Sequence, residues 1–161
     1  MKILDNKYDV IVIGGGASGM MAAGRAAELG KKVLLLEKNK NLGEKLKITG
    51  GGRCNITNAE EDEHILLSHY SQSKNFLYSP FSQFGMKDTF SFFEGQGLPL
   101  VVQARKRAFP KTEKALDVYK VLEKYIKKAM LFIRASPKAT LSNSPSPEKL
   151  SMVQRLSSKN S

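Results

Sequence analysis

Residues 14–19 read Gly-Gly-Gly-Ala-Ser-Gly and stand between an apolar run and a stretch of small residues typical of a closely packed helix. Gly14 permits a tight turn off a strand, Gly16 lets backbone approach a pyrophosphate without a Cβ in the way, and Gly19 lets a helix lie close to the strand. The N–H groups and positive dipole of the helix start would face the phosphates. The pattern predicts a dinucleotide-binding turn made of Gly14, Gly15, Gly16, Ala17, Ser18 and Gly19. The alternative is a glycine turn that binds nothing.

Glu37 supplies the carboxylate that such a turn requires. It follows the glycines by about twenty residues and ends a second apolar run, Val33–Leu36. At the carboxyl end of a neighbouring strand, this side chain is placed to accept hydrogen bonds from ribose hydroxyls. It would also repel a 2′-phosphate, so we expect no NADP at this particular site.

A second glycine cluster, Gly50-Gly51-Gly52, precedes Arg53, Cys54 and Asn55. Three consecutive glycines stabilise neither a helix nor a strand, but they allow unusual backbone angles or close approach to a flat or charged ligand. The Arg53 guanidinium is a planar donor fork that fits phosphate, and Asn55 adds a short hydrogen-bonding side chain. A flexible surface loop is the alternative.

The sequence contains no arrangement typical of an obligate protein nucleophile or acid–base pair, so we predict neither a catalytic residue nor a metal site. Cys54 has no CxxC partner and cannot form a dithiol redox centre. The neighbouring Arg53 would lower the pKa of its thiol, although a structural cysteine in a tight loop is the favoured interpretation. His64 and His69 have no partner at ligand spacing, so we interpret both as surface or hydrogen-bonded side chains.

A βαβ unit is needed to position the first turn and Glu37. We predict a strand over about 7–13, a helix over 18–29 that ends at Gly30, and a second strand over 32–37. Both strands are apolar almost throughout, which is typical of strands buried on both faces. They should be parallel neighbours joined by a right-handed crossover.

The rest of the chain supplies cover and further strands. Residues 99–109 read as a short hairpin, and residues 130–134 fit one more sheet strand. A helix should begin at 110–112, since apolar residues from Ala115 to Ile126 recur at helical spacing. Residues 59–97 read as a helical connection with helical spacing over 82–93. Its phenylalanines are interpreted as core under the sheet: Phe76, Phe81, Phe84, Phe90, Phe92 and Phe93.

Composition places the 161-residue chain among globular proteins, with 41% hydrophobic and 25% charged residues. No apolar run approaches the roughly twenty residues that span a bilayer, and the N-terminus lacks a signal-peptide pattern. Together with the single cysteine, these features predict a cytoplasmic protein with no membrane partner. The net charge of +11 suits an anionic ligand such as a dinucleotide. Because the basic residues are scattered, we expect no nucleic-acid partner.

Residues 43–58, Gly-Glu-Lys-Leu-Lys-Ile-Thr-Gly-Gly-Gly-Arg-Cys-Asn-Ile-Thr-Asn, strongly resemble a signature of one bacterial flavoprotein family. The family is labelled BaiN-like, aminoacetone-oxidase-like or NAD(P)/FAD-dependent oxidoreductase. The resemblance covers about residues 5–128 and includes the segments 8–23, 97–100 and 107–115. It implies that FAD is the cofactor and that NAD(P)H reduces the flavin. The flavin would then reduce a small-molecule substrate such as an unsaturated carbonyl, or be reoxidised by oxygen.

The resemblance also implies which residues bind FAD. The first turn would hold the pyrophosphate and Glu37 the adenosine ribose, while the segment from Lys45 to Asn58 would lie along the pyrophosphate, the ribityl chain or the flavin edge. Beyond the first turn, the implied cofactor-binding residues are Glu37, Lys38, Lys45, Thr49, Gly50, Gly51, Gly52, Arg53, Cys54 and Asn55.

We therefore expect an α/β fold in which residues 1–134 form an incomplete, Rossmann-like FAD-binding domain with a parallel sheet and a helical and hairpin insertion. Residues 135–161 are rich in serine and proline, which predicts an irregular, low-order tail. Resembling proteins are much longer, and the resemblance ends near residue 129. This suggests a truncated or frameshifted reading frame, which the downstream coding DNA would test, and a short protein with its own tail is the competing account.

Three functions remain open from the sequence. The first is the N-terminal portion of an FAD-dependent oxidoreductase. The second is a catalytically inactive fragment of such an enzyme. The third, suggested only by the net charge, is a basic nucleic-acid-binding module.

Overall fold

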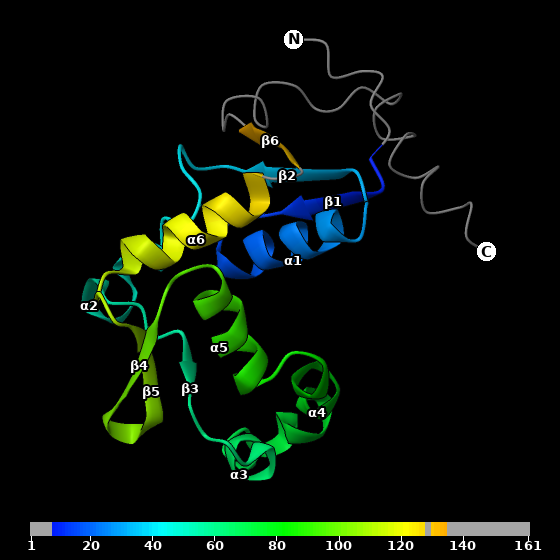
Figure 1. Ribbon diagram of the computed structural model, residues 1–161. Coiled ribbons are helices and arrows are strands. Elements are labelled where there is room, and N and C mark those ends of the chain that lie inside the picture. Colours follow the sequence, from blue (N-terminus) through cyan, green and yellow to red (C-terminus); the bar gives the residue numbers. More distant parts are fainter. Residues whose placement is uncertain (1–7, 128–129, 135–161) are drawn as a thin grey trace, which may run out of the picture.

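The computed structural model describes residues 8–127 and 130–134 of the chain. A parallel sheet lies at one end of the molecule, and a small antiparallel sheet with further helices lies at the other (Figure 1). The predicted tail over 135–161 lies outside the described residues. The elements are β1 (Val10–Ile13), α1 (Ala17–Glu28), β2 (Val33–Glu37), α2 (Thr49–Gly52), β3 (Thr57–Asn58), α3 (Glu63–Ser68), α4 (Lys74–Gln83), α5 (Met86–Gly95), β4 (Leu100–Gln103), β5 (Arg107–Pro110), α6 (Ala115–Lys127) and β6 (Met130–Arg134).

The first sheet has three parallel strands in the order β1-β2-β6. Val10 of β1 pairs with Val33 of β2, and Glu37 at the end of β2 pairs with Arg134 of β6. The predicted strand–helix–strand unit is confirmed, and so is the predicted strand over 130–134. Because β1 and β2 are parallel, they end at the same edge of the sheet, where the Gly14 N–H donates to the Leu36 carbonyl at 2.8 Å.

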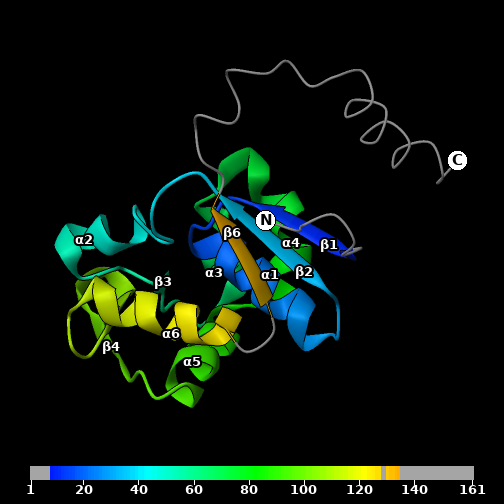
Figure 2. The same cartoon turned by 90° about the horizontal axis from the view of Figure 1, so that it is seen from above.

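The helices α1 and α6 cover one face of this sheet (Figures 1 and 2). They pack so closely that a Cβ on Gly24 of α1 would lie 2.2 Å from Cε1 of Tyr125 in α6. Their apolar side chains join those of β2 in one core, which includes Met20, Ala23, Val33, Leu35, Val118, Leu122, Tyr125 and Ile126. The periodicity predicted for α6 is therefore confirmed, since its apolar stripe faces this core.

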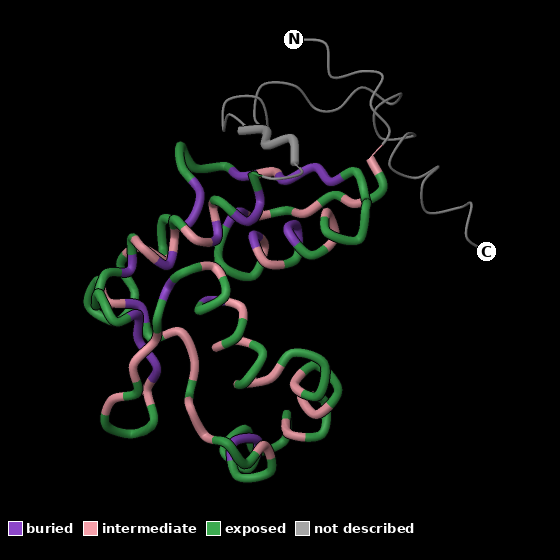
Figure 3. The backbone as a smooth tube through the Cα atoms, in the orientation of Figure 1, coloured by how far each residue is buried: buried purple, intermediate pink, exposed green. Residues whose placement is uncertain are grey.

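The burial of β1 differs from the prediction. Its residues alternate between half-buried and exposed, and Ile11 and Ile13 are 53% and 85% exposed. Val10 and Val12 pack against the core on the other face, whereas no described helix covers Ile11 and Ile13 (Figure 1). The prediction that β1 is buried on both faces is wrong for the described residues. β2, the central strand, is buried along most of its length (Figure 3).

The second sheet is antiparallel and has the strand order β3-β5-β4. Leu100 pairs with Pro110, so the predicted hairpin is confirmed. The helix that follows begins at Ala115 and not at 110–112, because Pro110 still belongs to β5 and Glu113 has a positive φ of 52°. β3 pairs with β5 through Thr57, which ties the hairpin to the segment just after the second glycine cluster.

The helical spacing predicted over 82–93 hides a break between α4 and α5. Gly85 precedes α5, and its N–H donates to Asp88 Oδ2 at 2.9 Å. A Cβ on Gly85 would lie 2.9 Å from the Phe81 carbonyl oxygen, so the chain turns where only glycine fits well. A single helix over 82–93 is therefore wrong, because α5 begins at Met86.

The phenylalanines are only partly in the core. Phe93 is buried, and the Phe92 ring packs edge-on against Tyr125 at a centroid distance of 4.9 Å. Phe76, by contrast, is 79% exposed on α4. The reason is architectural, since α3 and α4 lie at the far end of the molecule from the parallel sheet (Figure 1).

The close contact between α1 and α6 predicts that Gly24→Ala destabilises the protein by about 1–3 kcal/mol, because the new Cβ would enter the space of the Tyr125 ring. Helix propensity alone predicts the opposite sign, a gain of about 1 kcal/mol. Gly95→Ala in α5 is the matched control, since a Cβ there meets no atom within 4 Å, and it should be neutral or stabilising. Urea unfolding of both variants measures the difference. A Gly24→Ala protein as stable as Gly95→Ala would contradict the packing described.

Candidate functional site

The first glycine turn joins the end of β1 to the start of α1. Gly14 has a φ of 99°, and a Cβ on Gly19 would lie only 1.9 Å from the Gly14 carbonyl oxygen. Both positions therefore require glycine unless the backbone shifts. Gly16 stands at the N-cap of α1 and provides no side-chain hydrogen bond to the helix, and a Cβ on Gly16 would meet nothing within 4 Å. The first N–H groups of α1 thus open onto unfilled space.

Glu37 holds this turn from the neighbouring strand. Its Oε2 accepts a hydrogen bond from the Gly15 N–H at 2.6 Å, and its Oε1 accepts one from the Asn39 N–H at 2.8 Å. Glu37 is only 7% exposed. A Cβ on Gly15 would lie 2.2 Å from Cδ2 of Leu42 and 3.2 Å from Glu37 Oε2, so the turn needs glycine here as well.

The hydrogen bonds of Glu37 determine its ionisation. Burial by itself raises the pKa of this carboxyl, but donation by the N–H groups of Asn39, Gly15 and Lys38 outweighs burial and brings the pKa below its ordinary value of 4.5. Glu37 is therefore ionised at neutral pH. Each carboxylate oxygen has a second lone pair, so the group can also accept hydrogen bonds from a ligand's hydroxyls.

A cleft of about 690 Å³ lies at the carboxyl ends of β1 and β2, which is where open parallel sheets bind ligands. The structure brings together here most of the residues predicted around the first turn: Gly14, Gly16, Ala17, Ser18, Gly19, Glu37, Lys38, Lys45 and Thr49. Gly15 is buried behind them. The open helix N-terminus and the two lysines suit a pyrophosphate, and Glu37 suits a ribose, so the cleft fits a dinucleotide.

The second glycine cluster forms a left-handed turn. Residues 50–52 have φ values of 56°, 66° and 84°, and Cys54 has a φ of 61°. The unusual backbone angles expected here are therefore confirmed, and the element labelled α2 is not a regular right-handed helix. The turn is closed by the Cys54 N–H, which donates to the Thr49 carbonyl at 3.0 Å. Glycine is the residue that adopts successive left-handed conformations with least strain.

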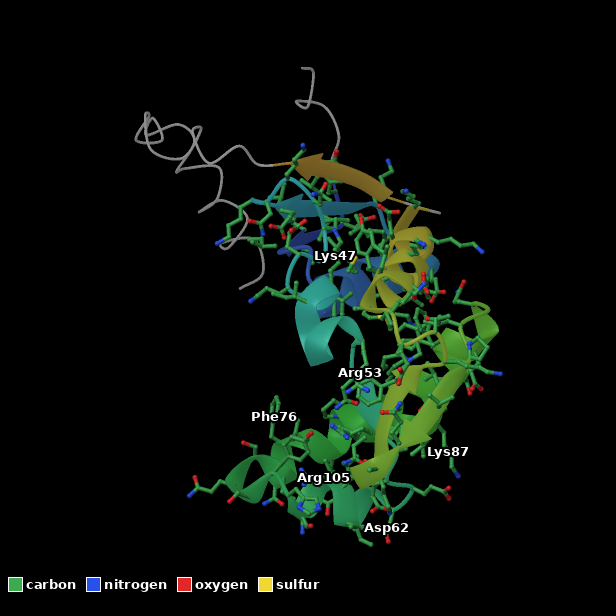
Figure 4. The ribbon with its side chains drawn as sticks, turned by 90° about the vertical axis from the view of Figure 1, so that its left-hand side faces the viewer. Lys47, Arg53, Asp62, Phe76, Lys87 and Arg105 are labelled. Carbon is green, nitrogen blue, oxygen red and sulfur yellow. The ribbon has the colours of Figure 1, made fainter. Side chains whose placement is uncertain are left out.

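Arg53 leaves this turn toward the β4–β5 hairpin (Figure 4). Its Nη1 donates to Gln103 Oε1 at 3.3 Å and lies 3.5 Å from Glu113 Oε1. Its guanidinium lies 4.6 Å from the centroid of the Phe109 ring. Neither Arg53 nor residues 50–52 line the cleft at the first turn, so the structure does not bring them together with the other predicted site residues.

Cys54 and Asn55 line a second pocket, of about 510 Å³, which shares Ala17, Ser18, Leu46 and Thr49 with the cleft. Its remaining walls are mostly apolar: Met21, Ile56, Phe84, Thr89, Phe93, Val118 and Leu122. Burial raises the pKa of the Cys54 thiol above its ordinary value of 9.0, and a hydrogen bond with the Thr49 side chain offsets only part of this rise. The prediction that Arg53 lowers the pKa of this thiol is wrong, and the buried thiol agrees with a structural cysteine.

Sequence reasoning missed several residues of the cleft: Ile13, Leu36, Asn39 and Leu46. Asn39 carried a usable signal, because a backbone N–H two residues after a carboxylate commonly closes on it. Leu46 carried none. Its position depends on Gly43, which has a φ of 65° and whose N–H donates to the Gly15 carbonyl at 2.8 Å, so that the chain turns back beside the first turn.

Other kinds of site are not found in the part of the chain that the structure describes. No helix there is both long and apolar enough to cross a membrane. Within the same residues, no three His, Cys, Asp or Glu side chains gather as they would around a metal ion. The Nδ1 atom of His64 forms a hydrogen bond of 2.9 Å with the Tyr78 hydroxyl group.

The sequence matches the family described as HI0933-like protein Rossmann domain over residues 8–156, a range that includes most of the serine- and proline-rich segment. It is 35% identical over 114 residues to the 3-dehydro-bile acid delta(4,6)-reductase of Clostridium scindens. The matched segment covers 70% of this chain and 27% of that protein. It is also 35% identical over 92 residues to the ribosomal RNA dihydrouridine synthase of Escherichia coli, covering 57% and 22%. The chain thus spans about a quarter of the length of these relatives.

A solved structure shares the fold. It is the 3-ketosteroid-delta4-(5alpha)-dehydrogenase from Rhodococcus jostii RHA1, which matches with a TM-score of 0.55 over 82% of this chain and 39% of that chain. At 14% sequence identity, this likeness shows the Rossmann-like fold alone.

The lowered pKa of Glu37 predicts a pH-dependent effect of Glu37→Gln. The amide would present an NH₂ group to the N–H of Gly15 or Asn39, so the variant should lose about 1–3 kcal/mol of stability at pH 7. Because folding depresses this pKa, the advantage of the wild type is full above pH 4.5 and shrinks as the pH falls through the folded value, where both proteins carry a neutral group.

Urea unfolding of the wild type and the variant between pH 7 and pH 3 measures this difference. Glu44→Gln, which changes an exposed carboxylate, is the control and should have little effect. A stability difference that is absent at pH 7, or that stays constant down to pH 3, would show that the ionised Glu37 does not hold the turn.

Proposed function

The chain belongs to the HI0933-like Rossmann-domain family of FAD-dependent oxidoreductases, and we propose that it forms the FAD-binding part of such an enzyme. The observation that carries the proposal is the unfilled space at Gly16. Backbone N–H groups open there beside an ionised Glu37, in a cleft that a single added Cβ would partly fill. Nothing in the protein occupies the space that a side chain at this position would take, so the missing side chain leaves room for a ligand.

In this proposal each residue of the cleft has a distinct role. The N–H groups at the start of α1 hold the pyrophosphate, and Lys38 and Lys45 add positive charge. Glu37 accepts hydrogen bonds from the adenosine ribose. The bound flavin supplies hydride or electron transfer. The apolar pocket that continues from Ser18 and Thr49 has a volume of about 510 Å³, which is large enough for a flat ring beside the pyrophosphate.

We further propose that NAD(P)H reduces the flavin and that the protein is cytoplasmic.

The two relatives above are named for a bile acid and for ribosomal RNA, yet both match a large share of this chain. That difference supports a division of labour in which this part serves the shared cofactor and other residues of the relatives select the substrate.

RNA is a second candidate for the substrate, favoured by the net charge of +11 together with the identity to the Escherichia coli enzyme. Binding through phosphate contacts should fall steeply as salt is raised. Filter binding of a structured RNA between low and physiological salt tests this candidate. Binding that is absent at low salt, or insensitive to salt, would argue against it.

Gly16→Ala tests the main proposal, because the change adds a methyl group to the cleft beside the helix N-terminus without contacting the protein around it. Its Cβ meets no atom within 4 Å, and Gly16 has a φ of −77°, which alanine adopts freely. Stability should change by less than about 0.5 kcal/mol. FAD affinity should fall at least about tenfold, since the methyl group displaces the pyrophosphate from the helix N-terminus. Fluorescence titration of FAD measures the affinity, and urea unfolding measures the stability.

Gly19→Ala serves as the contrasting variant, because its Cβ would lie 1.9 Å from the Gly14 carbonyl and should destabilise the fold itself. Equal FAD affinity in Gly16→Ala and the wild type would contradict the proposed site. A wild-type chain that stays colourless and binds no added FAD would favour the alternative of an inactive fragment.

A further inference from the structure

The second glycine turn needs support from outside itself. Glycine loses more conformational freedom on folding than any other residue, and residues 50–52 are three glycines held at positive φ. Within the turn, the Cys54 N–H donates to the Thr49 carbonyl at 3.0 Å, and the longer bond from the Arg53 N–H to the Gly50 carbonyl measures 3.3 Å. Two such bonds are a small gain against the entropy of ordering three glycines.

Backbone pairing with β5 holds the chain just after the turn, where the Ile56 N–H donates to the Ala108 carbonyl at 2.8 Å. Side-chain support comes from Arg53, whose contacts lie fifty and more positions away in the sequence. Gln103 Oε1 at the end of β4 accepts a hydrogen bond from Arg53 Nη1 at 3.3 Å, and Glu113 Oε1 before α6 forms an ion pair with the same Nη1 at 3.5 Å. Gln103 and Glu113 are themselves joined, since Gln103 Nε2 donates to Glu113 Oε1 at 2.5 Å. The guanidinium also lies over the ring of Phe109, which is fully buried in β5.

We propose that Arg53 is a positioning residue that clamps the Gly50–Cys54 turn to the β4–β5 hairpin through Gln103, Glu113 and Phe109, and thereby sets the wall of the apolar pocket beside the cofactor cleft. The inference rests on the proposed FAD site for its functional meaning, but the clamp itself is a property of the protein without cofactor. It differs from the role expected of Arg53 from the sequence, in which its guanidinium contacts the pyrophosphate directly.

The chemistry of arginine fits a clamp of this kind. The planar guanidinium can lie flat on an aromatic ring while its edge contacts a carbonyl and a carboxylate oxygen, whereas a lysine ammonium has no flat face to stack. The Arg53 and Glu113 side chains are both partly exposed, so their ion pair alone would be weak. The fixed, buried Phe109 ring and the bridging Gln103 give the arginine one defined position.

The clamp also explains how the turn affects the pocket. Cys54 and Asn55, which follow Arg53, both line the apolar pocket. Hydrogen bonding assigns the Asn55 amide nitrogen to the position 3.2 Å from the carbonyls of Thr57 and Ala108, and in this orientation it donates to both and fixes Asn55 against the hairpin. If Arg53 lost its contacts with Gln103, Glu113 and Phe109, the backbone of residues 50–52 would sample more conformations. Cys54 would then lose the defined position that closes one side of the pocket.

Hydrogen exchange in the protein without cofactor tests the clamp. Arg53→Gln and Glu113→Gln should each speed deuterium uptake in a peptide spanning residues 49–55 by about five- to tenfold, because both break the same contact. The double variant should be no faster than Arg53→Gln, since the two side chains act as a unit. Arg53→Lys should lie between the wild type and Arg53→Gln, because lysine keeps the positive charge of the ion pair and loses the planar group that lies over the Phe109 ring.

Arg105→Gln is the matched control, because it removes the same charge from the exposed tip of the same hairpin (Figure 4). It should leave uptake in residues 49–55 unchanged, and all variants should leave a peptide spanning residues 14–24 unchanged. Uptake like that of the wild type in Arg53→Gln or in Glu113→Gln would overturn the clamp. So would fully additive effects in the double variant.

Titration with FAD and with ADP separates the clamp from a direct phosphate contact. A clamp predicts that Arg53→Gln and Glu113→Gln both weaken FAD binding by about fivefold and leave ADP binding unchanged, because ADP occupies only the cleft at the first turn. A direct contact predicts that Arg53→Gln weakens both ligands while Glu113→Gln weakens neither, and this result would overturn the clamp. If the wild type binds neither ligand, the proposed FAD site fails, while hydrogen exchange still decides the clamp.

Discussion

The hydrogen bond from the Gly15 N–H to the Glu37 carboxylate is the contact on which the cofactor cleft depends. It joins the turn after β1 to the end of β2, and it is possible only because a buried carboxylate finds several backbone donors at the sheet edge. The same contact places the start of α1 and keeps Glu37 ionised. The negative charge that would otherwise be costly to bury thus becomes the means by which two strands and a helix meet at one point.

Glycine makes this arrangement possible for steric reasons that differ between positions. At Gly15 and Gly19 a side chain would collide with the protein, and at Gly14 the backbone angle itself favours glycine. At Gly16 nothing in the protein opposes a side chain. Sterics or backbone angle therefore require three of the four glycines, whereas the missing side chain at Gly16 leaves room for a ligand.

The sequence predicted those parts of the molecule that local chemistry determines. The first turn, its flanking strands and helix, and Glu37 all lie within thirty residues of one another, and their spacing was sufficient to place them. The exposure of Ile11 and Ile13 was not predictable in the same way. An apolar run indicates that a strand prefers burial, but it does not reveal whether another element covers each face. The break at Gly85 was likewise hidden, because phenylalanines on both sides of it keep helical spacing.

Arg53 shows where reasoning from residue type reaches its limit. A guanidinium after three glycines suits a phosphate, but it suits a carboxylate and an aromatic ring equally well. Which partner it contacts depends on a hairpin that begins about fifty residues later, and therefore on the tertiary fold. The two glycine turns consequently differ in how they are held. The first is fixed by a neighbouring strand through Glu37 and needs only the βαβ unit. The second is fixed by a distant hairpin, so the pocket beside it can be correct only when the antiparallel sheet has also formed.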